Sequence, residues 1–295
     1  MTGLLSAVDI VAVVGAQLGL DCRLVRVLGE RTGQCRVVQL STSDGRLLVG
    51  KSAVDGLGRH AAAAAAALGA QDLLPLAVPR PLGYLARHRV LVQESVSGAV
   101  PSEREPGRFE QIGAALSRLH ASSVVLGPPT SVADHLRDLV RPHPAALAHA
   151  FPMLSAQINE LLELLLALPA CGAAPIHRDL HPRQLLLTRS RVWLLDWDLA
   201  AQGDPALDVG NLCAYLRARW APTSAESAVA AFLAGYTPTA GPGVMDRVGW
   251  FEAFASLRLA CKAFRLQGAA AQPAVTELLT HARQCAGRVV DHAGV

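Results

Sequence analysis

Two groups of polar residues interrupt the otherwise apolar C-terminal half of the chain. The first is the run HRDLHPRQ at residues 177–184, and the second is DWD at residues 196–198. The segment between them, 185–195, has the length of a β-hairpin, and such a hairpin would bring Asp179, Gln184 and Asp196 together at its open end. Two carboxylates and an amide oxygen are ligands that suit a hard cation. The spacing therefore predicts a magnesium site.

Together with the run GDPALD at residues 203–208, these groups resemble three ordered motifs of the aminoglycoside phosphotransferase and choline kinase family. The family patterns are H-x-D-x-x-x-x-N, I-D-W-[DEG] and G-D-P-x-x-D, and their order and spacing match over about 30 residues. Any one motif alone would be weak, but the three coincide. The resemblance implies a protein-kinase-like fold, a phosphotransferase activity towards a hydroxyl group, and ATP or GTP with Mg²⁺ as cofactors.

The resemblance assigns roles to the matching residues. It implies that Asp179 is the catalytic base and that His177 shapes the loop around it. Arg178 would face phosphate or acceptor groups. Asp196 would bridge magnesium to the nucleotide phosphates, although a strand-end turn residue is the plainer alternative. Asp208 would be a buried, structural acceptor of hydrogen bonds from the loop backbone.

Two further residues are expected near the metal. Gln184 stands where the family pattern has Asn, and its amide oxygen lies one methylene further out. It would bind the metal directly or through water, or else point into the wall of the site. Asp198 is either a second metal contact or a solvated neighbour of Asp196.

Lysine is rare in this sequence, which contains 25 Arg and only two Lys, Lys51 and Lys262. Lys51 ends a β-like run, where the kinase fold places the Lys that pairs with the nucleotide phosphates. The expected partner is a Glu on the following helix, predicted near 59–70, but that helix contains none. Asp55 and Asp72 are the nearest carboxylates in the sequence, so the usual ion pair is in doubt.

The remaining expectations for nucleotide binding depend on the backbone. Gly29 and Gly33 are candidates for a loop over the phosphates, with an ordinary hairpin turn as the alternative, since their spacing is not G-x-G-x-x-G. Residues 93–96, including Glu94 and Val96, resemble the hinge whose main-chain groups bind adenine.

Strand and helix patterns explain how these residues would be positioned. We expect helices at 5–19 and 59–70 and strands at 22–28, 35–40, 46–51, 81–87 and 89–95. Beyond Gly98 and Pro101 the chain reads as mainly helical. Helices are expected at 109–120 and 153–169, with four more from 205 onward. The predicted fold is α+β and protein-kinase-like. A small β-rich lobe (1–97) would bind nucleotide, and a larger helical lobe (98–295) would hold the catalytic and acceptor sites.

Composition excludes several other classes of protein. Hydrophobic residues make up 51% and charged residues 17%, so global disorder is not expected. A net charge of +3 with no basic run, and 4% aromatic residues, argue against nucleic-acid binding. The N-terminus reads as an amphipathic helix and the apolar run 161–168 is too short for a membrane span. The cysteines, Cys171 among them, form no C-x-x-C pair, so we expect a cytoplasmic protein without zinc.

The acceptor is not readable from the sequence, and two other functions stay open. One is a kinase acting on Ser or Thr of a peptide, such as a ribosomal natural-product precursor. The other is a nucleotide-binding pseudokinase, favoured by Gln184 and the missing Glu. A polycationic aminoglycoside is not the expected acceptor, because from residue 201 seven acidic residues face eight basic ones. The acidic residues are Asp204, Asp208, Glu226, Asp246, Glu252, Glu277 and Asp291.

Overall fold

The structure, a computed structural model of the 295-residue chain, describes residues 3–169 and 172–293, with side chains as far as residue 287. Cys171 and the side chain of Asp291 lie outside these ranges. Contacts divide the chain into two compact units, each described by itself. The first comprises Met1–Ala99 and Gln184–Ala200, and the second comprises Val100–Arg183 and Ala201–Val295. A single boundary at residues 97/98 does not represent this division, because 184–200 packs with the first unit.

An antiparallel sheet of five strands, in the order β1-β2-β3-β6-β5, forms the centre of the first unit. Gly33 lies in the β1–β2 turn with φ of 68°, and Gly45 lies in the β2–β3 turn with φ of 83°. At these angles the backbone of a residue with a Cβ would be strained. All five predicted strands are thus present, at β1 (Cys22–Arg31), β2 (Cys35–Thr42), β3 (Leu47–Ala53), β5 (Pro81–Leu85) and β6 (Val90–Glu94).

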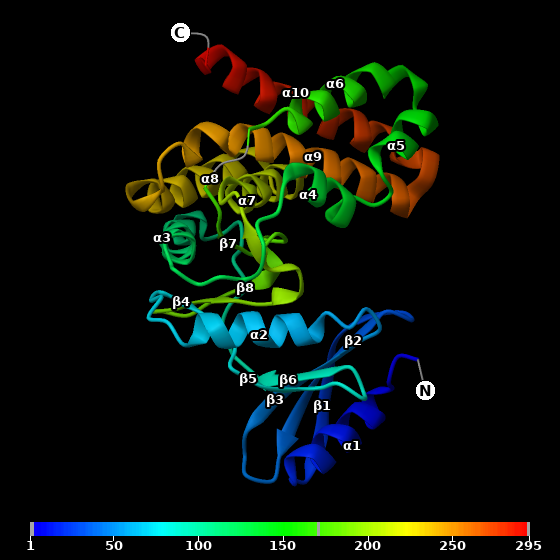
Figure 1. The fold of residues 1–295 in the computed structure, drawn as a ribbon, viewed down its shortest axis with the longest axis vertical. Helices are drawn as coiled ribbons and strands as arrows, with labels where there is room; N and C mark the ends of the chain where they lie inside the picture. Colours follow the sequence, from blue (N-terminus) through cyan, green and yellow to red (C-terminus); the bar gives the residue numbers. More distant parts are fainter. Residues whose placement is uncertain (1–2, 170–171, 294–295) are drawn as a thin grey trace. The chain divides into compact units, whose positions relative to one another are not determined.

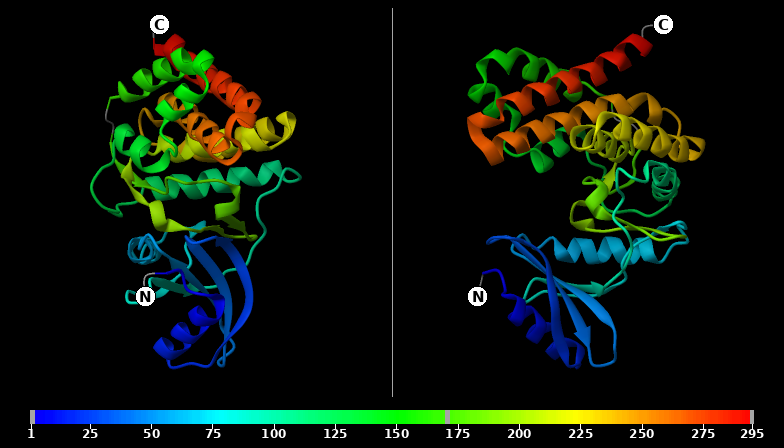
Figure 2. Two further views of the ribbon diagram at one scale, coloured as in Figure 1. Left: turned by 90° about the vertical axis from the view of Figure 1, so that its right-hand side faces the viewer. Right: turned by 180° about the vertical axis from the view of Figure 1, so that it is seen from behind.

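Two helices cover opposite faces of this sheet, as Figures 1 and 2 show: α1 (Ala7–Leu18) and α2 (Gly58–Gly69). A capping box between Ser6 and Asp9 starts α1. The core beneath α1 is made of Ile10, Val14, Val38, Leu40, Leu48, Val90 and Val92. On the other face, Gly58 of α2 packs against Tyr84 and Leu91. Leu91 is paired directly with Lys51 across the strands, so α2 covers the face that carries Lys51.

A second, smaller sheet completes the first unit. Strands β8 (Leu185–Leu187) and β9 (Val192–Leu194) form the predicted antiparallel hairpin, and β4 (Leu76–Ala77) pairs in parallel with β9. At the open end of the hairpin, the N–H of Leu195 donates to the carbonyl of Gln184 at 2.9 Å. The hairpin therefore holds residues 184 and 196 at the same end.

The second unit is mainly helical. The apolar face predicted for 109–120 is confirmed, with Phe109, Ile112, Leu116 and Leu119 at most 2% exposed. Two short strands, β7 (Ala174–Ile176) and β10 (Ala201–Gly203), pair antiparallel beside the helices. The helices are α3 (Phe109–His120), α4 (Val132–Leu139), α5 (Pro144–Ala150), α6 (Ser155–Leu166), α7 (Ala206–Arg219), α8 (Pro222–Tyr236), α9 (Val244–Gln267) and α10 (Gln272–Ala293).

The long helix α9 lies between α7 and α10 (Figure 1). Gly210 allows α7 to approach α9 closely, since a Cβ at this position would meet the backbone nitrogen of Glu252 at 2.4 Å. Such backbone approach is possible only for a residue without a side chain. The contact fixes the register of α7 against α9, the two helices that support the loop at 177–181.

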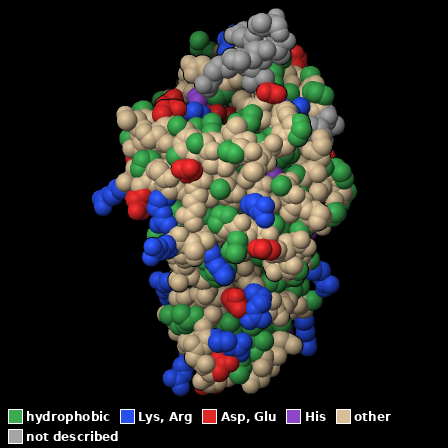
Figure 3. All heavy atoms as spheres, turned by 90° about the vertical axis from the view of Figure 1, so that its left-hand side faces the viewer, with side chains coloured by type: hydrophobic (Ala, Val, Ile, Leu, Met, Phe, Trp, Pro, Cys, Tyr) green, Lys and Arg blue, Asp and Glu red, His purple; other side chains and the backbone are tan. Residues whose placement is uncertain are grey.

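Among the helices that the structure describes, none has the combination of length and apolar character that a membrane crossing requires. On the face drawn in Figure 3, Lys and Arg side chains are separated by hydrophobic, acidic and uncharged ones. Charge on this face is therefore mixed.

Candidate active site

Lys51 on β3 lies between two carboxylates of the first unit. Its Nζ is 2.5 Å from Oδ1 of Asp196 and 2.6 Å from Oδ2 of Asp198, and its side chain is 12% exposed. Burial lowers the pKa of Lys51, but the two carboxylates outweigh burial and hold the pKa above its usual value. Asp198 thus occupies the partner role that the sequence could not assign on α2.

The helix α2 is attached to the same segment in a different way. His60, in its first turn, has Nε2 2.6 Å from the carbonyl oxygen of Ala200. Sequence analysis did not single out His60. The only available signal is that it is the one imidazole in a helix otherwise made of Ala, Gly, Leu and Arg.

Asp196 follows β9 with φ of 62°, a left-handed conformation that is uncommon outside glycine. The three residues after Asp196, Trp197–Leu199, form a 3₁₀ turn. The indole of Trp197 is buried and donates to the carbonyl of Leu194 at 2.9 Å, which fixes the turn. The side chain of Asp196 is 36% exposed, whereas that of Asp198 is 12% exposed.

A cation fits the oxygen atoms of this segment. Oδ1 of Asp198 is buried and has no hydrogen-bond partner within the described residues, and an anionic oxygen left in this state is costly unless a cation or donor reaches it. Burial also raises the pKa of Asp198 above its usual range. Carboxylate oxygens are ligands that Mg²⁺ prefers, so Asp196 and Asp198 offer a suitable donor set.

Gln184 ends the 3₁₀ turn Pro182–Gln184 beside this segment. Its Nε2 donates to Oδ2 of Asp196 at 3.3 Å. The predicted proximity of Gln184 to Asp196 is therefore confirmed. In this orientation the amide nitrogen faces Asp196, and a half-turn of the amide would present the oxygen to a cation.

The glycine and hinge residues lie in the same unit. Gly29 is inside β1, next to a bulge, and Gly33 is in the β1–β2 turn. A Cβ at either position would meet nothing within 4 Å. Glu94 ends β6 and Val96 follows it; both line a hollow of about 480 Å³ that also includes Trp193 of β9. Their binding roles stay predictions.

In the second unit, Asp208 organises the loop around Asp179. Its two oxygens accept from the backbone N–H of His177 at 2.7 Å and of Arg178 at 2.8 Å. These are the contacts that the resemblance implied for a buried Asp. Burial raises the pKa of Asp208, but hydrogen bonds from His120 and His177 outweigh it, so the pKa lies below the usual range. The carboxylate therefore stays ionised as an acceptor.

Arg178 is oriented into the protein rather than towards solvent. Its φ of 67° is left-handed, and its side chain is 8% exposed. Nε donates to Nδ1 of His135 at 3.2 Å and Nη2 donates to Asp138 at 3.1 Å. Burial and the neighbouring guanidinium lower the pKa of His135 to about 4, so it accepts as a neutral ring. Within the second unit, Arg178 anchors the loop to α4.

Asp179 is held through one of its two oxygens. Oδ1 accepts from Nη2 of Arg258 at 2.6 Å, while Oδ2 lies 3.9 Å from Nε2 of His181. Burial, chiefly, lowers the pKa of His181 to about 4, so this neighbour is uncharged at neutral pH. The other arm of Arg258 donates to the carbonyl of Arg178 at 3.2 Å, and Asn211 donates to that of Leu180 at 2.7 Å.

Sequence reasoning missed Arg258 and Asn211. Arg258 lies on an apolar face of α9 and Asn211 on an apolar face of α7, where a polar side chain needs a hydrogen-bond partner. That was the available signal. Arg183, which follows Pro182 in the motif run, is exposed.

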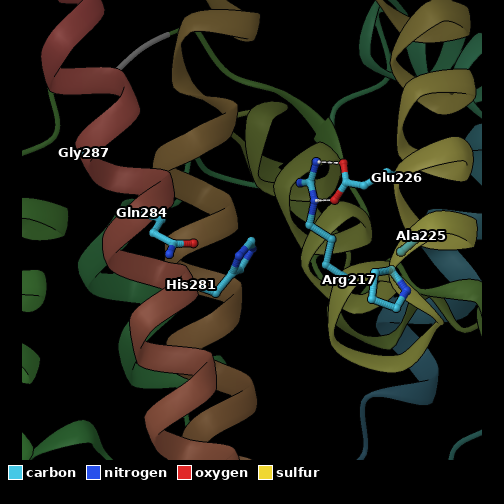
Figure 4. Close-up of a pocket in the computed structure, with 7 residues that line it drawn as sticks. Arg217, Ala225, Glu226, His281, Gln284 and Gly287 are labelled. Carbon is cyan, nitrogen blue, oxygen red and sulfur yellow. Dashed lines mark hydrogen bonds and ion pairs between the residues drawn. The ribbon is translucent and has the colours of Figure 1, made fainter.

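A larger hollow, of about 710 Å³, lies elsewhere in the second unit and contains none of the predicted site residues. It is lined by residues of α7, α8 and α10, and Figure 4 shows Arg217 paired with Glu226 on one side and His281 on the other. Arg217 also binds Glu252 at 2.5 Å, and His281 binds the same carboxylate oxygen at 2.8 Å. Glu252, His281 and Cys285 lie close enough to hold a metal, but Glu252 already has two cationic partners. We interpret the group as an ion-pair network.

Solved structures with the same fold include a choline/ethanolamine kinase family protein from Mesorhizobium loti. It is 20% identical, with a TM-score of 0.58, and 91% of this chain and 87% of that chain are covered. A macrolide 2′-phosphotransferase from Brachybacterium faecium is 21% identical, with a TM-score of 0.62 and coverage of 92% and 97%. An amicoumacin kinase in complex with AMP-PNP, Ca²⁺ and Ami is 13% identical, with a TM-score of 0.63 and coverage of 88% of each chain.

The predicted α+β, kinase-like fold is thus confirmed. No curated protein matches the chain in sequence. A sequence model of the phosphotransferase enzyme family matches residues 34–248, which is most of the chain. The predicted kinship is confirmed: this chain belongs to the phosphotransferase enzyme family.

Proposed function

We propose that this protein transfers the γ-phosphoryl group of ATP or GTP to a hydroxyl group of a small molecule, with Asp179 as the catalytic base. The observation that carries the proposal is the state of Asp179. Its loop is fixed by two backbone bonds to Asp208, and Arg258 binds only one of its carboxylate oxygens. The other oxygen, Oδ2, is the atom that we assign to the acceptor hydroxyl.

The first unit would bind the nucleotide. Lys51 pairs with the phosphates, while Asp196, Asp198 and Gln184 supply the oxygen ligands for Mg²⁺. The complex of the amicoumacin kinase with AMP-PNP and Ca²⁺ supports a nucleotide with a divalent cation in this fold. When bound, the metal neutralises charge on the phosphates. Glu94 and Val96 would contact the base through their backbone, and Gly29 and Gly33 would lie near the phosphates.

The step itself needs little from the protein beyond positioning and charge. The acceptor oxygen forms a bond to the γ-phosphorus as the bond between that phosphorus and the β–γ bridging oxygen breaks. The hydroxyl proton passes to Oδ2 of Asp179, and the nucleoside diphosphate leaves. His177 and Arg178 hold the loop for this transfer and do not themselves exchange protons.

The cellular setting follows from the chemistry of the thiols. Among the described residues, Cys22, Cys35, Cys213 and Cys261 are free thiols, as is usual for proteins of a reducing compartment. We therefore assign the reaction to the cytoplasm. A hydroxyl on a peptide is the competing acceptor, because the catalytic loop of protein kinases has the same sequence, His-Arg-Asp, as residues 177–179.

Replacing the base tests the proposal. Asp179→Asn should lower the rate of phosphate transfer from labelled ATP by about 10²-fold or more, while ATP binding, measured by calorimetry with Mg²⁺, is retained. Asp246→Asn removes an exposed carboxylate of the same unit and serves as the control. An Asp179→Asn protein that transfers phosphate at the wild-type rate would show that Asp179 is not the base. Wild-type protein that binds ATP and never consumes it would be a pseudokinase.

A further inference from the structure

The surroundings of Asp179 carry an excess of positive charge. Asp179 and Arg258 neutralise each other through the 2.6 Å contact. Lys262 lies one turn further along α9, and Arg265 lies about one turn beyond it, while Arg219 approaches from α7. Among the charged groups that act on Lys262, Asp179 is the carboxylate, whereas Arg258, Arg219 and Arg265 are cations.

Among the described side chains, Arg219, Lys262 and Arg265 have no carboxylate partner in an ion pair. The acidic residues of this unit are engaged elsewhere or exposed: Asp204 binds Arg247, and Glu226 and Glu252 bind Arg217. Lys262 is half-buried, whereas Arg219 and Arg265 are exposed. Both arginines act on Lys262 as like charges, and a bound anion would offset this repulsion.

The geometry gives the cluster a direction. Nζ of Lys262 lies 5.8 Å from the ring centre of Tyr215, and the ring of His181 packs against the same Tyr215 at 4.9 Å. Tyr215 therefore contacts both His181, which lies beside Oδ2 of Asp179, and Lys262. Burial and the neighbouring arginines lower the pKa of Lys262, so its charged form is less favoured than in water until an anion lies beside it.

We infer that the acceptor carries an anionic group, a carboxylate or a phosphate ester, which binds Lys262, Arg219 and Arg265 while its hydroxyl reaches Oδ2 of Asp179. This inference rests on the proposed function and names its substrate class as hydroxy acids or sugar phosphates. Lys262 is one of only two Lys in a chain with 25 Arg. The same charges repel a polycationic aminoglycoside, in line with the acid-poor sequence of this half of the chain.

Matched acceptors test the inference in wild-type protein. Labelled ATP and Mg²⁺ are incubated with glycerate against glycerol, ribose 5-phosphate against ribose, and kanamycin. We expect kcat/KM at least about tenfold higher for each anionic member than for its neutral counterpart, and none for kanamycin. Equal or faster transfer to a neutral or cationic member overturns the inference and leaves the proposed function in place.

A binding measurement tests the anion site without any turnover. Sulfate is titrated by calorimetry into protein saturated with AMP-PNP and Mg²⁺, so that the nucleotide site is already filled. Lys262→Met and Arg265→Gln should each weaken sulfate binding by about tenfold, whereas Arg283→Gln, which removes an exposed arginine of α10, should not. Absent sulfate binding, or equal binding by all variants, overturns the inference. Sulfate binding that depends on Lys262, in a protein that phosphorylates no acceptor, would sustain the anion site and reject the phosphotransferase.

Discussion

Lys51 binds two carboxylates that follow the same strand. In the kinase pattern that the sequence resembles, the partner of this Lys comes from a helix. In this chain Asp198 takes the place of that partner, 2.6 Å from Nζ, and α2 contributes His60 to the carbonyl of Ala200 instead. The carboxylates of Asp196 and Asp198 therefore both position Lys51 and offer oxygen ligands to a metal, and they lie only two residues apart.

Asp198→Ala should lower kcat/KM for ATP by about 10²-fold, because Lys51 loses a buried partner and the metal loses an oxygen. Asp55→Asn is the matched control, since it removes a neighbouring exposed carboxylate that does not contact Lys51. Steady-state kinetics with varied ATP measure both. If both variants lower kcat/KM by the same small factor, the effect comes from the loss of one negative charge near Lys51, and the assignment of Asp198 as its partner is wrong.

The site contacts that could be predicted from local spacing join residues close together along the chain, whereas those that were missed join distant residues. Motif spacing was enough to predict that Gln184 and Asp196 lie together, because one short hairpin joins them. Arg258 is 79 residues from Asp179 along the chain, and no local pattern reports such a contact. The left-handed φ values of Arg178 and Asp196 were equally hidden, since positive φ is uncommon outside glycine, even for Asp, in which it is enriched.

At the scale of elements, the α7–α9 contact places both supports of the catalytic loop. Asp208 and Asn211 lie on α7 and Arg258 on α9, and Gly210 lets the two helices approach. Helix and strand periodicity predicted the five strands of the larger sheet and every helix of twelve residues or more. It missed the two short helices α4 and α5, whose eight and seven residues complete only about two turns. It also missed β4, β7 and β10, because strands of two or three residues are too short to show a period.

Gly210→Ala should destabilise the protein by about 1–3 kcal/mol, because the added methyl meets the backbone of α9 and forces the helices apart. Gly287→Ala makes the same change in α10, where a Cβ has nothing within 4 Å. There the gain in helix propensity should be neutral or stabilising by up to about 1 kcal/mol. Urea unfolding of both variants compares the two sites. Equal effects would mean that α7 and α9 are not in close backbone contact.

The network joining α7, α9 and α10 predicts a pH-dependent stability. Hydrogen bonds to Cys285 and to the carboxylate of Glu252 raise the pKa of His281 to about 9. The other charged groups facing this network are Arg217 on α7 and Glu226 on α8. Because the folded pKa lies above the unfolded value of about 6.5, the stabilisation is complete below that pH and is lost as the pH rises to about 9.

His281→Gln should therefore be less stable than wild type at pH 6, by an amount on the order of 1 kcal/mol. The difference should shrink through the window from about pH 6.5 to 9. His149→Gln, at an exposed position on α5, controls for loss of an imidazole. Denaturant unfolding at a series of pH values gives the comparison. A difference that stays constant across this window would show that His281 is not the titrating group.

At the scale of the whole molecule, the chain leaves the first unit at residue 99, builds much of the second, and returns for residues 184–200. Motif order along the sequence could not reveal this return, because it is set by pairing of β4 with β9 and by contacts of Lys51 with Asp196 and Asp198. The residues proposed to bind nucleotide all lie in this discontinuous unit. The proposed base and the cationic group around it lie in the other.

Nucleotide binding should accordingly protect two stretches that are far apart in sequence. With Mg²⁺ and AMP-PNP at about 100 times Kd, the bound state gains about 2.7 kcal/mol, so amides that exchange only through opening of this unit should exchange roughly 100-fold more slowly. Hydrogen-exchange mass spectrometry should place the strongest protection at 47–51, 94–97 and 184–198. Asp196→Ala should lose it throughout. Protection confined to residues before 100 would show that 184–200 does not bind the nucleotide, and protection strongest along α7 and α9 would place the nucleotide in the second unit instead.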